Sequence, residues 1–400
     1  MPPPTDRPWK RTILTAIAHG ANALRGHRRL SLEELQSIRN FLVLQYEKPL
    51  GSVVHATPFF QALRQSAPDA SIVVAASAMA ASVLGKNPAI DRCEVTPDPW
   101  NGFPRAMQSI RRLLTAMPTG PRCIVTMIGN QRTRVAMLSL LAADATRAGY
   151  TLAPELYDVP LSFQPERGQI EGNLDILRAL GHRVNLCEPR IFFGQEDADY
   201  AADLLAALPG GVARPRIVYG TQNSGGQPNQ WSAERFQQVI EALSEQTGAD
   251  PICVGTGEEA ANIEQLRQPL RNSGISLAGR TTIPQLAAVF AQADLAISLD
   301  TGTFHVARAV GLPGVVIAPA WQSPLEWLPV DHPRYRVLRG PSIEKPGDGY
   351  WIAEVQVEQV IAAALPLLRE SLASRTARRT RIDGALATPR NPRSASRTTI

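Results

Sequence analysis

The amino-acid sequence predicts an α/β protein in which two units of parallel β-sheet follow one another along the chain. Three observations support this. Short apolar runs alternate with longer segments of helical pattern, the cycle starts again after a break near residues 190–200, and a chain of 400 residues is long enough for two domains. Hydrophobic residues make up 44% of the sequence and charged residues 19%, which is ordinary for a globular protein.

The first unit begins with a short apolar run that predicts a strand at residues 41–44. Further strands are expected at 71–75, 93–95 and 123–126, with helices at 57–64, 79–84, 105–116 and 134–143. Pro58 would lie in the first turn of the first helix, where proline is tolerated because its missing N–H has no helical partner. The alternation of strand and helix predicts a parallel sheet.

The second unit repeats this pattern after a helix at 200–208. Strands are expected at 216–219, 251–254, 275–277, 295–298 and 314–317, with helices at 233–246, 258–270, 283–292 and 303–310. Ligands of such sheets bind at the carboxyl ends of the strands, so we expect a cleft between two Rossmann-like domains. The expected boundaries are an N-terminal extension at 1–37, domains at 38–195 and 196–370, and a tail at 371–400.

The formal net charge of +5 is concentrated at the two ends of the chain. A basic end on each side of a near-neutral body favours contact with an anionic surface, and solvated tails are the alternative. Of anionic surfaces we expect lipid rather than nucleic acid. Ser, Thr, Arg and Pro dominate the last thirty residues, which predicts a disordered tail. The clustered basic residues are Arg7, Lys10, Arg11, Arg25, Arg28 and Arg29 at one end and Arg375, Arg378, Arg379, Arg381, Arg390, Arg393 and Arg397 at the other.

The cysteines and the apolar runs indicate a cytoplasmic protein. The four cysteines lie far apart, which suits neither a zinc site nor a disulfide framework. No apolar run reaches the roughly 18 residues that span a bilayer, and the N-terminus lacks the apolar core of a signal peptide. We therefore expect a location in the cytoplasm.

The strongest candidate site follows the strand at 295–298, in the sequence Ser-Leu-Asp-Thr-Gly-Thr-Phe-His at 298–305. The N–H groups of a helix that starts near Thr303 favour a diphosphate, and Gly302 allows close approach of the backbone. Thr301 offers a hydroxyl donor and His305 a ring donor. Asp300 would repel phosphate, so it either orients the loop or meets a sugar hydroxyl. A plain helix N-cap at Asp300 or Thr301 is the alternative.

A second turn, Gly-Thr-Gly-Glu-Glu-Ala at 255–260, matches the dinucleotide-binding fingerprint G-x-G-x-x-A. The acidic residue expected about 20 residues further on is missing, and Arg280 stands there instead. An NADP-dependent oxidoreductase is therefore one alternative. Glu258 is better explained as a carboxylate that accepts ribose hydroxyls, or as a negative charge at a helix N-terminus.

Residues 38–370 resemble glycosyltransferase family 9, the bacterial ADP-heptose:lipopolysaccharide heptosyltransferases. The run from Asp300 to Pro313 is similar to the family's D-T-G-x-x-H-x-A-x-x-x-G-x-P motif. Three shorter segments also resemble family motifs in the correct order, at 50–58, 224–236 and 277–281. The resemblance implies a GT-B fold, with two Rossmann-like domains that face each other across a cleft. It also implies that the donor nucleotide binds the C-terminal domain, and that transfer is metal-independent and inverting.

The chain departs from the family pattern at several positions, which include Tyr46 in place of an arginine and Lys48-Pro49 in place of a serine pair. Two further departures bear on the chemistry. The aspartate proposed as the family's general base is Ser52, whose hydroxyl has no suitable pKa for that role. The basic residue that pairs with the donor phosphates is Asn229. His55, which titrates near neutral pH, and Glu47 are the candidates to replace the base, and Lys48 is the candidate for the missing positive charge. The expected donor-binding residues are Lys48, Gly51, Ser224, Gly225, Asn229, Glu258, Thr281, Asp300, Thr301, Gly302 and His305.

The sequence thus predicts a glycosyltransferase that moves a sugar, heptose from ADP-heptose, to a lipopolysaccharide or another lipid-linked glycan. The nucleotide sugar is a substrate, so the resemblance implies no cofactor and no metal. The acceptor would be met by peripheral contact with the inner face of the cytoplasmic membrane. The departures at Ser52 and Asn229 also allow a catalytically impaired scaffold that binds a nucleotide sugar.

Overall fold

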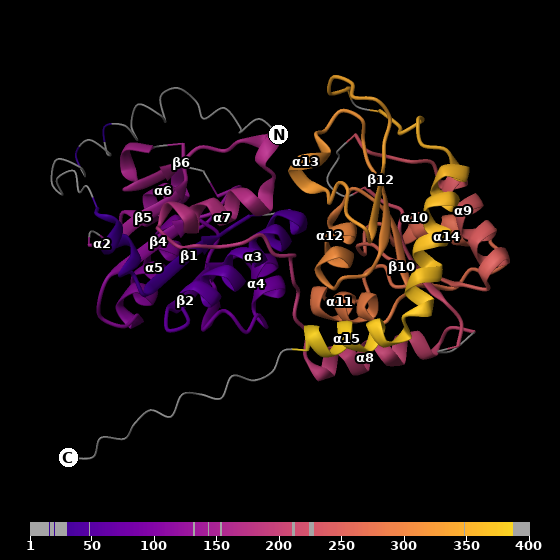
Figure 1. Ribbon diagram of the computed structural model, residues 1–400, viewed down its shortest axis with the longest axis horizontal. Helices are drawn as coiled ribbons and strands as arrows, with labels where there is room; N and C mark the ends of the chain where they lie inside the picture. The colour runs from indigo at the N-terminus through magenta and orange to yellow at the C-terminus, as the bar shows by residue number, and fades with distance from the viewer. Residues whose placement is uncertain are drawn as a thin grey trace, which may run out of the picture.

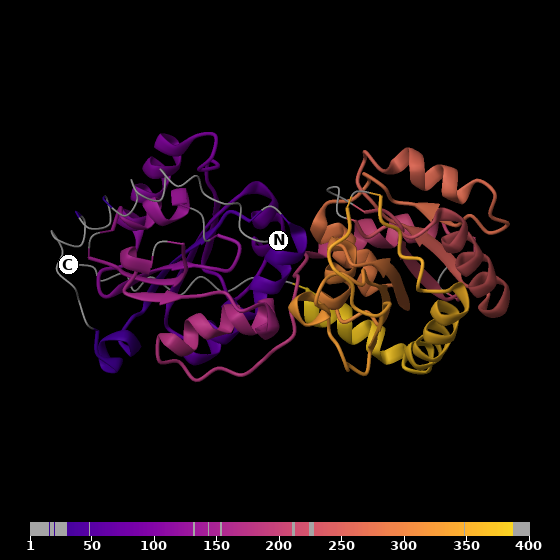
Figure 2. The same cartoon turned by 90° about the horizontal axis from the view of Figure 1, so that it is seen from above.

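The computed structural model describes residues 30–47, 49–130, 133–142, 144–152, 154–209, 213–223, 228–347 and 349–386, together with Ala16 and Gly20. In these ranges the chain forms two parallel six-stranded sheets, one in each half of the chain. Figure 1 shows them as two lobes side by side, the first in indigo and magenta and the second in orange and yellow. The view from above in Figure 2 shows the same two lobes joined at a narrow waist.

The first sheet has the strand order β3-β2-β1-β4-β5-β6. Its strands are β1 (Asn40–Gln45), β2 (Ser71–Ala76), β3 (Arg92–Val95), β4 (Arg122–Thr126), β5 (Thr146–Tyr150) and β6 (Val159–Leu161). The helices of this half are α2 (Leu32–Gln36), α3 (Leu50–Ser66), α4 (Ala78–Leu84), α5 (Phe103–Ala116), α6 (Thr133–Ser139) and α7 (Gln169–Ala179), with short 3-10 turns at η1 (Pro154–Leu156) and η2 (Pro165–Arg167).

The second sheet has the strand order β12-β11-β10-β7-β8-β9. Its strands are β7 (Arg216–Gly220), β8 (Asp250–Cys253), β9 (Ile275–Ser276), β10 (Leu295–Leu299), β11 (Gly314–Ile317) and β12 (Tyr335–Leu338). Its helices are α8 (Gln195–Ala206), α9 (Ala233–Thr247), α10 (Ala260–Arg267), α11 (Ile283–Ala291), α12 (Gly302–Ala309), α13 (Pro324–Trp327), α14 (Val357–Ala373) and α15 (Arg375–Ala385).

Helices cover both faces of each sheet, and β1 shows how the sequence achieves this. All six residues of β1 are buried, and side chains alternate between the two faces of a strand. Phe41 and Val43 belong to the cluster on the α3 side, while Leu42 and Leu44 pack with α5 and α6. The cluster on the α3 side continues into α11, α12 and β7 of the second half, so apolar packing joins the two domains.

Helix α3 begins at Leu50, seven residues earlier than the sequence predicts. Pro58 therefore lies inside the helix and cannot bond the carbonyl oxygen of Val54. The hydroxyl of Thr57 donates to that oxygen at 2.8 Å, and the same hydroxyl oxygen accepts the backbone N–H of Arg190 at 2.9 Å. The fully buried Thr57 thus repairs the helix and ties it to the segment that leads to the second domain.

Replacement of Thr57 by valine should show how much this hydroxyl contributes to stability. Thr57→Val keeps the shape but leaves a buried carbonyl and a partly buried N–H without their hydrogen-bond partner, which should cost about 2 kcal/mol of unfolding free energy. Thr57→Ser keeps the hydroxyl and loses one methyl group, which should cost about 1 kcal/mol. Urea unfolding of both variants measures the difference, and a Thr57→Val protein as stable as the serine variant would contradict this explanation.

The structure differs from the sequence-based expectations at the sheet edges and near the C-terminus. Strands β5, β6 and β12 were not expected, and β5 carries Gly149 and the buried Arg147, which donates to the carbonyl oxygens of Ser139 and Leu156. The expected disordered tail at 371–400 is corrected over 371–385, because α14 and α15 occupy those residues. Packing explains this difference, since Ile382 and Ala385 lie against the main apolar cluster. Residues 387–400 and most of 1–29 lie outside the described residues.

Candidate functional site

The carboxyl group of Glu47 is held just beyond the carboxyl end of β1, where its residue is only 4% exposed. Asn130, in the loop after β4, donates from Nδ2 to Oε1 of Glu47 at 3.1 Å and accepts the N–H of Tyr46 at 2.8 Å. Gly129 has a φ of +89°, and a Cβ there would lie 2.6 Å from the carboxyl carbon of Glu47. Two neighbouring loops therefore fix this carboxyl group in place.

The surroundings of Glu47 change its acidity. Burial raises the pKa of Glu47 to about 8, and the nearby side chains of Ser52 and Gln45 offset only part of that rise. Within the described residues, Oε2 of Glu47 has no hydrogen-bond partner. A carboxylate whose pKa lies near the working pH is well matched to the role of general base. Ser52 lowers the pKa of this carboxyl group and so favours its ionised form.

The loop between β10 and α12 presents hydrogen-bond donors. Asn229 donates from Nδ2 to the carbonyl oxygen of Asp300 at 3.0 Å and so orients the loop. Thr301 occupies the N-cap position of α12, but its side chain makes no capping bond, and its buried hydroxyl oxygen has no partner in the described part of the chain. This hydroxyl and the first N–H groups of α12 can serve an anion. The side chain of Thr301 therefore does not cap α12, which excludes the alternative that this residue is a plain N-cap.

The carboxyl group of Asp300 is buried beside a second acid. Burial is the main cause that raises the pKa of Asp300 to about 7, and the charge of Glu326 adds to it. Glu326 accepts a hydrogen bond from Nε2 of Gln169, in the first domain, at 3.0 Å. Nε2 of His305 lies 3.6 Å from Oδ1 of Asp300. Asp300 therefore exists partly protonated near neutral pH, which limits its repulsion of a neighbouring phosphate.

Two buried histidines meet where the domains touch. The rings of His55 and His305 lie with centroids 4.6 Å apart, and Trp327 packs against both, at 5.4 and 6.0 Å. Burial, with a smaller effect of Arg308, lowers the pKa of His305 to about 3. Burial also lowers the pKa of His55 well below its usual value, and His305 and Arg308 add to this. Both rings are neutral at physiological pH, so His55 is a weak base and His305 carries no positive charge.

Glycines allow the N-terminal ends of α3 and α12 to touch. A Cβ on Gly51 would lie 2.5 Å from Cδ2 of His305, and a Cβ on Gly302 would lie 2.9 Å from Cδ2 of Leu50. In the last turn of α12, Arg308 makes two ion-pair contacts with Glu188, at 2.8 and 3.3 Å. The structure thus brings part of the predicted site together, with Ser52 and Glu47 on one side and the 300–305 loop on the other.

The remaining predicted residues are placed as follows. Lys48, Ser224 and Gly225 lie outside the described residues. Glu258 is exposed on the loop after β8, and Thr281 is half-buried on the loop after β9. These loops are two and three strands away from β10 in the sheet. At about 4.8 Å per strand, that separation is on the scale of an extended nucleotide.

The turn at 255–260 is built by its own glutamate. The carboxylate of Glu259 accepts the N–H of Thr256 at 2.7 Å. Gly257 packs against Gly279, where a Cβ would lie 2.8 Å from the Cα of Gly257. The fingerprint spacing is therefore explained by close packing of two loops, which needs no dinucleotide.

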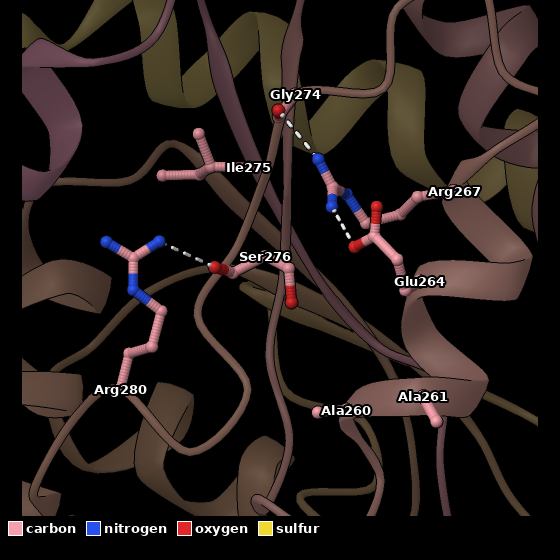
Figure 3. Close-up of a pocket in the computed structure, with 8 residues that line it drawn as sticks. All are labelled: Ala260, Ala261, Glu264, Arg267, Gly274, Ile275, Ser276 and Arg280. Atoms are coloured by element: carbon pink, nitrogen blue, oxygen red, sulfur yellow. Dashed lines mark hydrogen bonds and ion pairs between the residues drawn. The ribbon is translucent and has the colours of Figure 1, made fainter.

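A groove of about 500 Å³ lies on the outer side of these loops, between α10 and the edge strand β9. Figure 3 shows two arginines in it. Arg267 donates to the carbonyl oxygen of Gly274 at 2.9 Å, and Arg280 donates to that of Ser276 at 3.1 Å. These guanidinium groups cover the unpaired edge of β9. Arg280 is thus engaged with backbone rather than poised to read a 2′-phosphate.

Sequence reasoning missed Asn130, Glu326 and the pair of Arg308 with Glu188. Asn130 lies four residues beyond the predicted strand at 123–126, in the dipeptide Gly-Asn, and that position at the carboxyl end of a strand is the one signal that points to it. Glu326 and Glu188 become relevant only through contacts between segments distant in the sequence. Among the described residues, no group of three or more His, Cys, Asp or Glu side chains is arranged to hold a metal ion, and no described helix is long and apolar enough to cross a membrane.

Comparisons with known proteins bear on the family and the fold of this chain. The family model for glycosyltransferase family 9 (heptosyltransferase) matches residues 128–331, just over half of the chain. No curated protein sequence matches the chain. Among solved structures, a family 9 glycosyltransferase from Veillonella parvula DSM 2008 is 21% identical with a TM-score of 0.74, and the match covers 83% of this chain and 98% of that one.

Two structures from E. coli are also similar. ADP-heptose LPS heptosyltransferase II is 17% identical with a TM-score of 0.67, covering 82% of this chain and 99% of that one. A heptosyltransferase solved with ADP-2-deoxy-2-fluoro heptose is 17% identical with a TM-score of 0.59, covering 80% and 97%. At these identities the similarity establishes the fold, which is GT-B, as the sequence predicted.

Proposed function

Because this chain belongs to glycosyltransferase family 9, we propose that it transfers a sugar from a nucleoside diphosphate to an acceptor hydroxyl, with inversion and without a metal ion. The observation that carries this proposal is the contact between the N-terminal ends of α3 and α12. This contact supports the proposal because the buried carboxyl group of Glu47, whose pKa is raised, belongs to one domain and the uncapped N-terminal end of α12 belongs to the other.

The reaction is a single displacement at the anomeric carbon. Glu47 takes the proton of the acceptor hydroxyl, whose oxygen forms a bond to that carbon. The bond between this carbon and the diphosphate oxygen breaks, and the diphosphate leaves with the electron pair. The base and the leaving group belong to opposite domains, so attack comes from the side opposite the leaving group and inverts the configuration.

Each part of the donor has a place on the second domain. The diphosphate would bind the N-terminal end of α12, where N–H groups and the hydroxyl of Thr301 stabilise charge that grows as the sugar leaves. The nucleoside would lie over the loops after β8 and β9, with Glu258 and Thr281 in contact. Asp300 would meet a sugar hydroxyl, and Gly51 would allow the sugar to approach α3.

We infer that the donor is ADP-heptose and that the acceptor is a lipopolysaccharide or another lipid-linked glycan at the cytoplasmic membrane. The names of the similar structures, which refer to ADP-heptose and to heptosyltransferases, support the donor. Basic residues at both ends of the sequence support contact with an anionic membrane surface. A catalytically impaired scaffold is less favoured, because Glu47 supplies a base despite the serine at position 52. The engaged Arg280 disfavours the NADP oxidoreductase.

Nucleotide binding tests the proposal most directly. ADP at 100 times its dissociation constant should raise the melting temperature by about 3 °C, given the unfolding entropy of a chain of this size. UDP and GDP should raise it less, and release of ADP from ADP-heptose should require a lipid-linked glycan acceptor. A stronger shift with UDP or GDP would overturn the heptose assignment, and no shift with any nucleoside diphosphate would overturn the proposed function.

A further inference from the structure

The proposed leaving group needs a positive charge that the residues at α12 do not supply. A departing diphosphate gains negative charge, and charge-assisted contacts are about twice as strong as neutral ones. His305 is neutral because burial lowers its pKa to about 3. Arg308 is engaged by Glu188 through two contacts. The cation must therefore come from another element.

The loops and helix starts at the carboxyl end of the second sheet carry four described cations, and three of them donate to backbone oxygens. Arg235 donates to the carbonyls of Ile352, Ala353 and Val355. Arg280 donates to Ser276, and Arg339 donates to Ala320 and Gln322. The fourth is Lys345, whose ammonium lies over the ring of Trp321, 5.2 Å from its centroid. Within the described residues, the ammonium of Lys345 contacts an aromatic ring, and Lys345 is exposed to solvent.

The position of Trp321 connects Lys345 to the loop between β10 and α12, residues 300–301, which we call the donor loop. Strands β10 and β11 are neighbours, and the N–H of Asp300 donates to the carbonyl of Ile317 at the end of β11. Trp321, four residues further on, donates from Nε1 to the carbonyl of Pro228 at 2.7 Å. The next residue, Asn229, donates to the carbonyl of Asp300. Residues 228–229 thus hold both the loop at the start of α12 and the indole ring that Lys345 contacts.

We propose that Lys345 is a donor-binding residue whose ammonium leaves the face of Trp321 to pair with the diphosphate of the nucleotide sugar. A cation–π contact at an exposed site is weaker than a charge-assisted hydrogen bond to phosphate. The exchange is therefore favourable when the diphosphate arrives. This assignment rests on the proposed function, and it gives the site a positive charge although position 229 is an asparagine.

Calorimetry with ADP and AMP on single variants tests this assignment. Lys345→Met keeps an unbranched side chain on Trp321 but removes the charge, and should weaken ADP binding about ten-fold, the lower range for a bond to a charged group. AMP lacks the second phosphate, so its affinity should change less than two-fold. Lys345→Arg should keep ADP affinity within about three-fold. Arg271→Ala, which removes one positive charge from a residue 85% exposed elsewhere on this domain, is the matched control.

The outcomes separate this inference from the function on which it rests. ADP affinity unchanged in Lys345→Met, or an equal loss for ADP and AMP, overturns the role of Lys345 and leaves the proposed function intact. A ten-fold loss in Lys48→Met without a loss in Lys345→Met assigns the charge to Lys48 instead. If the unaltered protein binds no nucleoside diphosphate, both the function and this inference fail.

Discussion

Replacement of Glu47 by glutamine should reduce the rate of sugar transfer by about 100- to 10,000-fold, the range for loss of a general base. The amide has the size of the carboxyl group and can still accept the hydrogen bond from Asn130, so the loop should keep its shape. ADP binding should stay within about two-fold of the unaltered protein, because Glu47 lies on the acceptor side. Steady-state kinetics with a lipid-linked acceptor and calorimetry with ADP measure the two effects.

The pH dependence of the reaction identifies the base. Burial raises the pKa of Glu47 to about 8, and a base works only when deprotonated, so kcat/KM should rise with pH and level off above about 8. Asp300, with a pKa raised to about 7, would produce a limb at lower pH. His55 would produce none near 8, since its pKa is lowered. Glu47→Gln should abolish the limb near 8, whereas His55→Asn should retain it.

Glu47→Gln should also make the protein more stable. The pKa of Glu47 is raised in the folded state from 4.5 to about 8, so the folded state holds this proton more tightly and loses stability as pH rises through that window. Glu47→Gln removes this dependence, and its advantage should grow between pH 5 and pH 8 to the order of a few kcal/mol. Glu33→Gln, at an exposed position in α2, is the control. A Glu47→Gln protein that is fully active would exclude Glu47 as the base.

Replacement of Gly51 by alanine should separate the two domains where they touch. The new Cβ would lie 2.5 Å from Cδ2 and 3.0 Å from Nε2 of His305. The ring cannot easily retreat, because His55 and Trp327 pack against it. Overpacking of this kind should cost about 1–3 kcal/mol of stability. A misplacement of about 1 Å between base and donor should lower the transfer rate about 100-fold.

Two further glycine variants separate this effect from helix propensity. Gly384→Ala, in α15, places its Cβ where nothing lies within 4 Å, and should raise stability by about 0.5 kcal/mol through the better helix propensity of alanine. Gly302→Ala meets the side chain of Leu50 at 2.9 Å, which can move, so it should cost less than Gly51→Ala. Urea unfolding and transfer assays measure all three. Wild-type rates in Gly51→Ala would show that the helices need not meet this closely during transfer.

Local pattern was sufficient to predict much of the fold. Short apolar runs separated by helical segments identified the central strands of both sheets, because a strand buried on both faces needs a continuous apolar run. The edge strands β6 and β12 and the Gly- and Arg-containing β5 lack such a run. The turn at 300–302 could be recognised because a glycine and hydroxyl residues directly after a strand are a local feature. The start of α3 was missed because Pro58 resembles a first-turn proline, and its compensation by Thr57 is a contact that no periodicity reveals.

The sequence by itself determined the two-domain α/β architecture and the position of the donor loop, since both depend on residues close together in the chain. Only the tertiary structure decided which acidic or basic side chain suits the chemistry. The carboxyl group of Glu47, the proposed base, has a raised pKa because Gly129 and Asn130, about eighty residues away, bury and hold it. His55 loses that role because His305 and Trp327 enclose it. Acidity follows from burial and neighbouring charge, and both arise only when distant segments of the chain pack together.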